Sequence, residues 1–188
     1  MLDWSPILAA AVPYADFLER HGTPAQRSRW EAVHANIRLN DAQKSLLAGF
    51  KRRMPVLCLA GAWCGDCAGQ CPAFDHFALA SNGAIDLRFL DRDARPDARD
   101  ALAICGGNRV PAVLFLSEDG LEVGRYGDNT LSGYRRKALG QLGASCPTGI
   151  VPPDGASLDL TVSDWLDEFE RAQLILRLSP SLRARHDD

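Results

Sequence analysis

Two cysteines separated by two residues, Cys64 and Cys67, carry the clearest chemical signal in this sequence. They lie where a short apolar run gives way to a helical pattern, so Cys64 is expected at the start of a helix. Unpaired N–H groups and the helix dipole stabilise a thiolate there, and the thiolate is the nucleophile of disulfide exchange. Cys67, about one turn further, could reach the Cys64 sulfur and resolve a mixed disulfide. The spacing therefore predicts a redox dithiol.

A metal site is the main alternative for these cysteines. The run Cys64-x2-Cys67-x3-Cys71-Pro72 resembles the end of a ferredoxin signature, and zinc ribbons also use Cys-x-x-Cys. Gly61 stands where the ferredoxin signature needs its first cysteine. A continuous helix through the cysteines suits a redox dithiol better, so we predict no metal and no cofactor and keep an iron–sulfur or zinc site as the less favoured alternative.

The other cysteines have weaker interpretations. Cys71 follows Cys67 by four residues, which on a helix separates their Cβ atoms by about 5–6 Å, whereas a disulfide needs about 3.5–4.5 Å. A Cys67–Cys71 bridge would therefore require unwinding, and we interpret Cys71 as a packed apolar residue, with an accessory redox thiol as the alternative. Cys105 and Cys146 receive no role.

The dithiol must be positioned by a β-α-β-α-β-β-α order of elements. Apolar runs and turn signals predict strands and helices as follows: strand 56–60, helix 64–80, strand 85–90, helix 96–104, strand 110–116, strand 121–126 and helix 130–142. The first two strands flank a helix and should be parallel, while the last two form a hairpin. The fold class is therefore α/β, with a four-stranded mixed sheet covered by helices on both faces and a core domain at 54–143.

Helical segments flank this domain. Residues 1–53 are predicted to be an N-terminal helical extension, with helix starts at Thr23-Pro24 and at Asn40 or Asp41 and a weaker helix over 4–20 that Pro13 interrupts. Residues 144–188 are predicted to contain a Pro- and Gly-rich linker (144–157) and a helix (162–178). We expect its apolar stripe to pack on the domain, with dimerisation or partner binding as alternatives; the stripe is Trp165, Leu166, Phe169, Ala172 and Leu176.

The active-site segment, Trp63-Cys64-Gly65-Asp66-Cys67, resembles that of the thioredoxin superfamily, whose usual motif is Trp-Cys-Gly-Pro-Cys. Three further positions agree: Pro72 matches the helix-kinking proline, Pro111 the cis-proline before the third core strand, and Gly127 the glycine that ends the hairpin. The resemblance covers residues 54–143. Within the superfamily, the chain resembles bacterial thioredoxin-like proteins with a Trp-Cys-Gly-Asp-Cys site.

The resemblance implies roles for the residues around the dithiol. Pro111 should be cis and should face the cysteines, which would expose the Val110 backbone for pairing with an extended substrate segment. Trp63 should lie on the rim of the site as a contact surface, with a core tryptophan as the alternative. Gly65 and Asp66 complete the supporting set.

Three positions depart from the family pattern. Asp66 replaces a proline, and its negative charge should raise the pKa of Cys64 and make the couple more reducing. Cys58 falls on a buried aspartate that helps to move the proton of the resolving cysteine. The lysine that accompanies this aspartate aligns with about Phe89, so both members of a buried charged pair are replaced together.

Composition limits the partners. The chain has 188 residues and a formal net charge of −3, which does not favour nucleic acid or an anionic membrane as partner. The first residues lack a basic segment followed by an apolar run, so we expect a cytoplasmic protein. We predict a monomeric or weakly dimeric thiol–disulfide oxidoreductase that reduces protein disulfides and is recycled by an external dithiol or reductase. A thioredoxin-fold binding module with little turnover is the alternative.

Overall fold

The computed structural model describes residues 2–142 and 156–187, and its centre is a four-stranded mixed sheet in the order β2-β1-β3-β4. β1 pairs in parallel with β2 and antiparallel with β3, and β3 pairs antiparallel with β4. The strands are Met54–Ala60 (β1), Ile85–Asp91 (β2), Ala112–Leu116 (β3) and Glu122–Gly127 (β4). The predicted fold class, element order and strand directions are confirmed.

The strand sequences explain their places in the sheet. Every residue of β1 is buried, as expected for a continuous apolar run that has neighbours on both edges and helices on both faces. β4 is an edge strand and has no fully buried residue. The central position of β1 places its carboxyl end, and therefore the segment that contains Cys64, in the middle of one end of the sheet.

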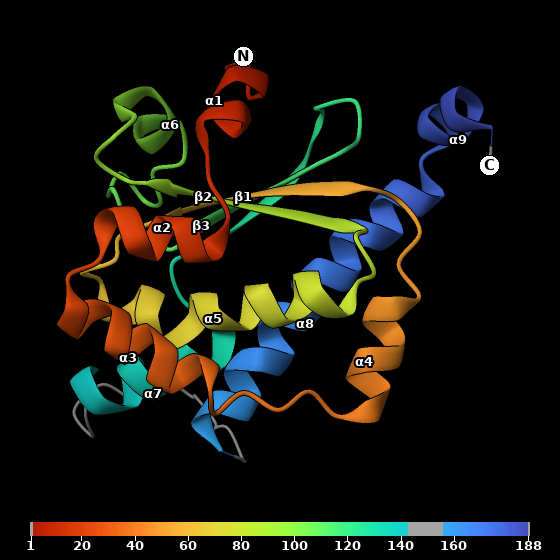
Figure 1. The fold of residues 1–188 in the computed structure, drawn as a ribbon. Coiled ribbons are helices and arrows are strands. Elements are labelled where there is room, and N and C mark those ends of the chain that lie inside the picture. The colour runs from red at the N-terminus through yellow and green to blue at the C-terminus, as the bar shows by residue number, and fades with distance from the viewer. Residues whose placement is uncertain (1, 143–155, 188) are drawn as a thin grey trace.

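Helices lie on both sides of the sheet. Figure 1 shows α5 (Gly65–Ala80) on one side together with the long C-terminal helix, and α6 (Pro96–Ala101) on the other. α7 (Leu131–Leu142) follows the hairpin, as predicted. α6 is shorter than the predicted 96–104, because Cys105 and Gly106 adopt positive φ angles and Ile104 pairs with Gly107 in a tight turn. This turn ends the helical backbone earlier than the sequence pattern indicated.

The N-terminal extension forms short helices, as the sequence predicts. Thr23 and Asn40 each make a capping box: the side chain accepts the N–H of the third helical residue, and the backbone N–H donates to the side-chain oxygen of that residue. Pro13 separates the first two helices, which explains why residues 4–20 do not form one helix. The helices are Ser5–Ala10 (α1), Tyr14–His21 (α2), Pro24–His34 (α3) and Asp41–Ala48 (α4).

The same extension covers one edge of the sheet. Val12 pairs with Phe89 of the edge strand β2 through two backbone hydrogen bonds of 2.9 and 2.7 Å. Tyr14, Phe17 and Trp30 pack their rings around Phe89. The N-terminal segment thereby satisfies backbone groups that an open sheet edge would leave unpaired.

The C-terminal segment forms α8 (Ser157–Leu178) and α9 (Pro180–His186). All five residues of the predicted stripe are buried, and Phe169 contacts the rings of Phe74, Phe77 and Phe115 at centroid distances of 5.6, 5.2 and 5.0 Å. The expectation that this stripe packs on the domain is confirmed. α8 begins five residues before the predicted start, and α9 was not predicted. Most of the predicted linker lies outside the described residues.

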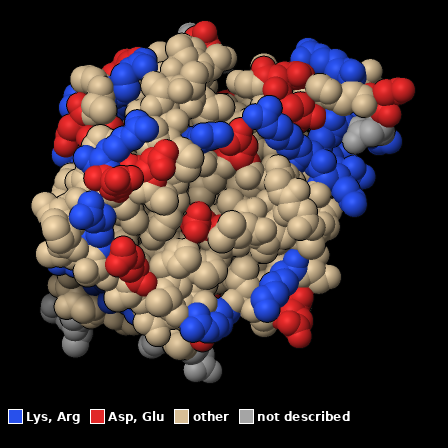
Figure 2. Space-filling model, viewed as in Figure 1, with Lys and Arg blue, Asp and Glu red and all other residues tan. Residues whose placement is uncertain are grey.

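The charged surface is mixed. Figure 2 shows acidic and basic side chains next to one another in several groups, with uncharged surface between them. This pattern agrees with the small net charge of −3. None of the described helices is both long enough and apolar enough to span a bilayer.

Candidate active site

Cys64 lies at the N-cap of α5, four residues after the end of β1. Its sulfur accepts the backbone N–H of Cys67 at 3.5 Å, which is the interaction that a helix start offers to a thiolate. Cys64 is partly exposed and Cys67 is fully buried, and both are free thiols. The structure therefore represents the reduced form, with the accessible sulfur at the helix start and the second sulfur behind it.

The loop before β3 lies against the Cys64 sulfur. The Val110–Pro111 peptide bond is cis, and the Cys64 thiol donates a hydrogen bond to the Val110 carbonyl at 3.6 Å. β3 begins at Ala112, two residues later than predicted, directly after a proline that has no N–H to donate to the sheet. Pairing of Ala112 with Leu59 places this loop beside the end of β1.

Trp63 is on the surface, as expected for a residue of the rim. Its side chain is 47% exposed, and the guanidinium of Arg92 lies 4.7 Å from the centre of its ring. A Cβ atom at Gly61 would lie 2.6 Å from the Trp63 ring. Glycine at position 61 therefore lets the indole fold back over the active-site loop, and sequence reasoning had not assigned that role to Gly61.

The two active-site thiols titrate together. A hydrogen bond with Cys67, followed by burial, raises the pKa of Cys64, although backbone N–H groups at the helix start act in the opposite direction. Burial opposes ionisation of Cys67 too, but hydrogen bonds from Cys64 and Cys71 bring its pKa well below the ordinary value. The pKa values of the two thiols are thus shifted in opposite directions, and the ionisation belongs to the pair.

Residues outside the core domain hold this site in place. The Trp30 indole of α3 donates a hydrogen bond to the Ala62 carbonyl at 3.0 Å, just before Trp63. From the other side, the Trp165 indole of α8 donates to the Gln70 side chain at 2.8 Å, and Gln70 donates to the Asp128 carbonyl at 3.1 Å. The sequence placed Trp165 on an apolar stripe but offered no signal for the polar contacts of either tryptophan.

Comparison with known proteins agrees with this geometry. A family model described as thioredoxin matches residues 12–130, which is well over half of the chain. The chain belongs to the thioredoxin family. No curated protein matches it.

Two solved structures show the same fold. A protein of unknown function from Pseudomonas aeruginosa is 22% identical, with a TM-score of 0.71, and the match covers 92% of this chain and 99% of that one. An HIV epitope-scaffold is 21% identical, with a TM-score of 0.63, and covers 95% and 99% of the two chains. At these identities the likeness concerns the fold alone, and it extends over both terminal segments of this thioredoxin-family protein.

Asp66 is the first departure from the usual thioredoxin motif. Its carboxylate forms an ion pair with Lys137 of α7 at 2.9 Å, which partly neutralises the charge. The sequence interpretation has Asp66 opposing ionisation of Cys64; in the structure its charge raises the pKa of Cys67. Gly65 has open space around the position of a Cβ atom, so packing gives no reason for glycine there.

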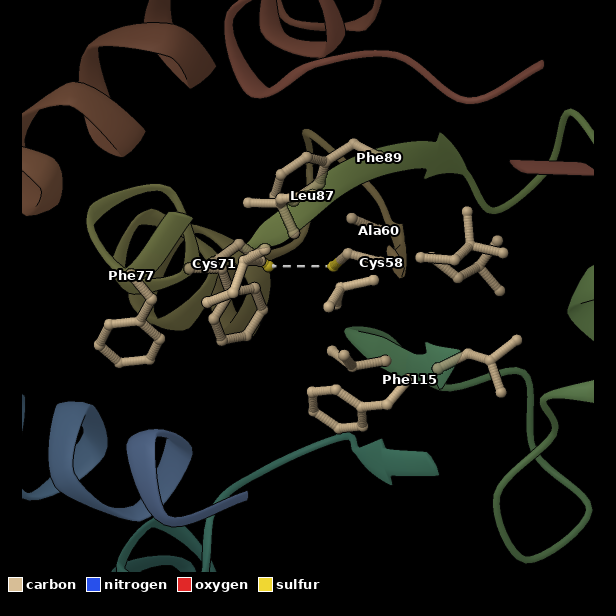
Figure 3. Packing of buried hydrophobic residues seen from close by; sticks show 14 of the residues in the cluster. Cys58, Ala60, Cys71, Phe77, Leu87, Phe89 and Phe115 are labelled. Atoms are coloured by element: carbon tan, nitrogen blue, oxygen red, sulfur yellow. Dashed lines mark hydrogen bonds between the residues drawn. The ribbon is translucent and has the colours of Figure 1, made fainter. Parts of the chain in front are cut away.

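Cys58 and Phe89 are the other departures, and the structure brings them together. The two residues are partners in the parallel register of β1 and β2, and both are completely buried. Phe89 packs among the aromatic rings of the N-terminal helices, where the usual lysine would be without water. Cys58 points toward α5, and its sulfur lies 3.8 Å from that of Cys71 (Figure 3). The charged pair is thus replaced by a ring and a thiol contact.

The alternative of a metal site finds no matching arrangement in residues 2–142 and 156–187. No group of three or more His, Cys, Asp or Glu side chains there is placed to hold an ion. Cys71 makes its sulfur contact with Cys58, and His76 lies against the His34 carbonyl at 3.1 Å.

Proposed function

We propose that this protein is a thiol–disulfide oxidoreductase that reduces disulfides on protein partners through Cys64 and Cys67. The observation that carries the proposal is the position of the Cys64 sulfur. It caps α5, accepts the Cys67 N–H, lies 3.6 Å from the Val110 carbonyl beside a cis-proline and is partly exposed next to the exposed Trp63. The proposed nucleophile, the proposed resolving thiol and the cis-proline loop are therefore adjacent.

The reaction proceeds by two exchanges. Cys64 transfers its proton to Cys67, and the resulting Cys64 thiolate attacks one sulfur of the substrate disulfide, which releases the other as a thiolate. Cys67 then loses its proton and attacks Cys64, which breaks the mixed disulfide and releases the reduced substrate. The protein is left with a Cys64–Cys67 disulfide, and the substrate has gained two electrons and two protons.

Recognition of the substrate would rest on its backbone. Val110 is buried in the free protein and its carbonyl accepts the Cys64 thiol, so a substrate segment would have to displace that contact to pair with the Val110 backbone. Main-chain pairing of this kind tolerates many side chains. The exposed Trp63 ring supplies an apolar surface beside it. Such a site fits a flexible protein segment that carries a disulfide.

An external dithiol or reductase must restore the reduced form after each cycle. The Cys64–Cys67 disulfide accepts two electrons from that donor by the reverse exchange. A reducing compartment such as the cytoplasm is the setting in which this direction of electron flow is sustained.

Trapping of the mixed disulfide tests the assignment. With a disulfide-bonded protein as substrate, Cys67→Ser should accumulate a covalent adduct on Cys64, because the resolving thiol is missing. Cys64→Ser should form no adduct and should have no reductase activity. Non-reducing electrophoresis followed by peptide mass spectrometry identifies the cysteine in the adduct.

Cys105→Ser is the matched control, because Cys105 is an exposed thiol outside the Cys64–Cys67 motif. It should reduce substrate at the rate of the unaltered protein. Adducts that form equally on Cys105 in the Cys67→Ser protein would contradict the roles given to Cys64 and Cys67. Substrate binding without any turnover would instead favour a binding module.

A further inference from the structure

Two cysteines that the proposed reaction does not use meet inside the protein. Cys58 comes from the central strand β1 and Cys71 from α5, and their sulfurs lie 3.8 Å apart. Both side chains are completely buried, and Figure 3 shows the two sulfurs facing each other across the interface between the strand and the helix. A contact between sulfurs on two different elements is the arrangement that a cross-linking disulfide needs.

This pair is connected to the active site through Cys67. Cys71 lies one helical turn beyond Cys67 on α5, and residues four apart on a helix are neighbours on its surface. The sulfurs therefore follow one another from the surface to the core in the order Cys64, Cys67, Cys71, Cys58. Because Cys58 and Cys71 have no exposed surface, a bulky disulfide in solution cannot reach them, and Cys67 is the sulfur from which oxidation can enter.

The helix geometry distinguishes a transient bridge from a stable one. Cysteines four residues apart on a helix have Cβ atoms about 5–6 Å apart, too far for a relaxed disulfide, so a Cys67–Cys71 bridge needs the turn to open. Pro72 lies in this turn and lacks the N–H that would otherwise bond to the Ala68 carbonyl. The turn has one hydrogen bond fewer to break. The Cys58–Cys71 contact spans two elements and carries no such restriction.

We propose that Cys58 and Cys71 form a second redox pair that stores two electrons and passes them to the Cys64–Cys67 disulfide. This inference rests on the proposed function, which supplies that disulfide. The Cys71 sulfur, after losing its proton, attacks Cys67, and Cys64 leaves as a thiolate that takes up a proton. The Cys58 sulfur, after losing its proton, then attacks Cys71, and Cys67 leaves and is protonated. The Cys58–Cys71 pair is oxidised, and the Cys64–Cys67 dithiol is restored.

The internal transfer should be slow at neutral pH. Burial raises the pKa of Cys58, and burial together with hydrogen bonds to Cys58 and Cys67 raises that of Cys71. Both thiols are therefore protonated at rest, and attack requires one of them to ionise in the interior. The active-site pair should be oxidised first, and the buried pair should follow at a rate that rises with pH.

Counting thiols during oxidation tests this inference. The protein with Cys105→Ser and Cys146→Ser retains four cysteines. It is reduced, mixed without oxygen with excess disulfide-bonded protein, quenched in acid, unfolded and alkylated. We expect the number of alkylated cysteines to fall from four to two and then to zero, and peptide mass spectrometry should find Cys64–Cys67 and Cys58–Cys71 bridges within one chain.

Two variants separate the possible outcomes. Cys71→Ser should stop after the Cys64–Cys67 bridge, and Cys67→Ser should leave Cys58 and Cys71 reduced because their route is cut. If the four-cysteine protein forms only the Cys64–Cys67 bridge at equilibrium, the second pair is disproved while the proposed function stands. If Cys58–Cys71 forms equally fast in Cys67→Ser, the relay is disproved. If Cys64 and Cys67 do not bridge at all, the proposed function fails and this inference fails with it.

Discussion

At the scale of single residues, the active site is a set of sulfurs whose charge is controlled by their neighbours. Arg92, in the loop after β2, lies over Trp63, and its charge also interacts with Cys64. No role for Arg92 could be predicted from the sequence. Its position over Trp63 depends on the pairing of β2 with β1 in the sheet. A cation next to a thiolate lowers the pKa of the thiol.

Removal of this cation should make the dithiol harder to ionise. Arg92→Ala should shift the pH dependence of Cys64 alkylation to higher pH by less than about one unit, since a charge near the surface contributes on the order of 1 kcal/mol. Alkylation rates followed by mass spectrometry between pH 5 and about 10 would measure the shift. Arg95→Ala is the matched control, because Arg95 pairs with Asp97. Equal shifts in both variants would contradict a specific role for Arg92.

Residues within local motifs can be placed from the sequence, whereas contacts between separate elements cannot. Local motifs predict where Cys64, Trp63 and Pro111 lie: Cys64 is at a helix start, Trp63 is exposed and Pro111 directly precedes β3, while their roles in catalysis stay predictions. The Cys58–Cys71 contact was not predicted, because it depends on the register between a strand and a helix 13 residues apart. Cys71 was predicted to be packed and is buried, but its partner could not be read from the sequence.

At the scale of elements, the segments outside the thioredoxin core act on the active-site loop. Trp30 of α3 is completely buried and donates its indole N–H to the carbonyl of Ala62. Local signals predicted α3 well, since a capping box and an apolar stripe lie within it. The same signals could not show that α3 contacts the loop 32 residues away.

Loss of that hydrogen bond should disturb the loop. Trp30→Phe keeps an aromatic ring but leaves the buried Ala62 carbonyl without its donor, which costs about 1–3 kcal/mol of unfolding free energy. We expect a slower reaction of Cys64 with substrate disulfide, measured by rapid quenching. Trp4→Phe, at a buried tryptophan next to α1, is the control and should leave the reaction rate unchanged. Equal rates in the two variants would rule out a positioning role for Trp30.

Asp128 ties the cis-proline loop to β4 and α7. It accepts hydrogen bonds from Tyr134 and from Arg109, the latter at 3.2 Å. Burial alone would raise the pKa of Asp128, but these hydrogen bonds hold it below the ordinary value. Its stabilising effect is therefore complete above the unfolded pKa of about 4 and is lost as the pH falls through the lower folded value.

The stability of Asp128→Asn at two pH values should show whether folding lowers the pKa of Asp128. At pH 7 the variant should lose about 1–3 kcal/mol of unfolding free energy. Near pH 2 to about 3, where the native carboxylate also becomes protonated, the difference from the unaltered protein should shrink. Urea unfolding at the two pH values measures both differences. A deficit that stays the same in acid would contradict an ionised, hydrogen-bonded Asp128.

At the scale of the whole molecule, α8 completes the core that supports α5, the helix that carries Cys67. Its aromatic residues Trp165 and Phe169 pack on Phe74, with ring centroids 4.5 and 5.6 Å away. The amphipathic pattern predicted that this helix would pack, because its apolar residues recur on one face. The pattern carried no information on which surface would receive it, since that depends on contacts remote in sequence.

Removal of the Phe169 side chain should destabilise the whole domain. Phe169→Ala removes a fully buried ring and should lower the free energy of unfolding by about 3–5 kcal/mol. If α8 and the sheet form one cooperative unit, tryptophan fluorescence and circular dichroism should report the same urea transition before and after the change. Leu178→Ala, at a side chain of α8 that is 74% exposed, should change stability by less than about 0.5 kcal/mol. Separate transitions would mean that α8 is an independent appendage.

The most direct test of the central claim is the redox equilibrium of Cys64 and Cys67. The protein is equilibrated with reduced and oxidised glutathione at a series of ratios, quenched in acid and analysed by peptide mass spectrometry. We expect a Cys64–Cys67 disulfide that forms as a two-electron couple, with the oxidised fraction changing tenfold relative to the reduced fraction for about 30 mV. If Cys64 and Cys67 instead stay separate thiols, or each carries glutathione, at the most oxidising ratios, they are not a redox dithiol.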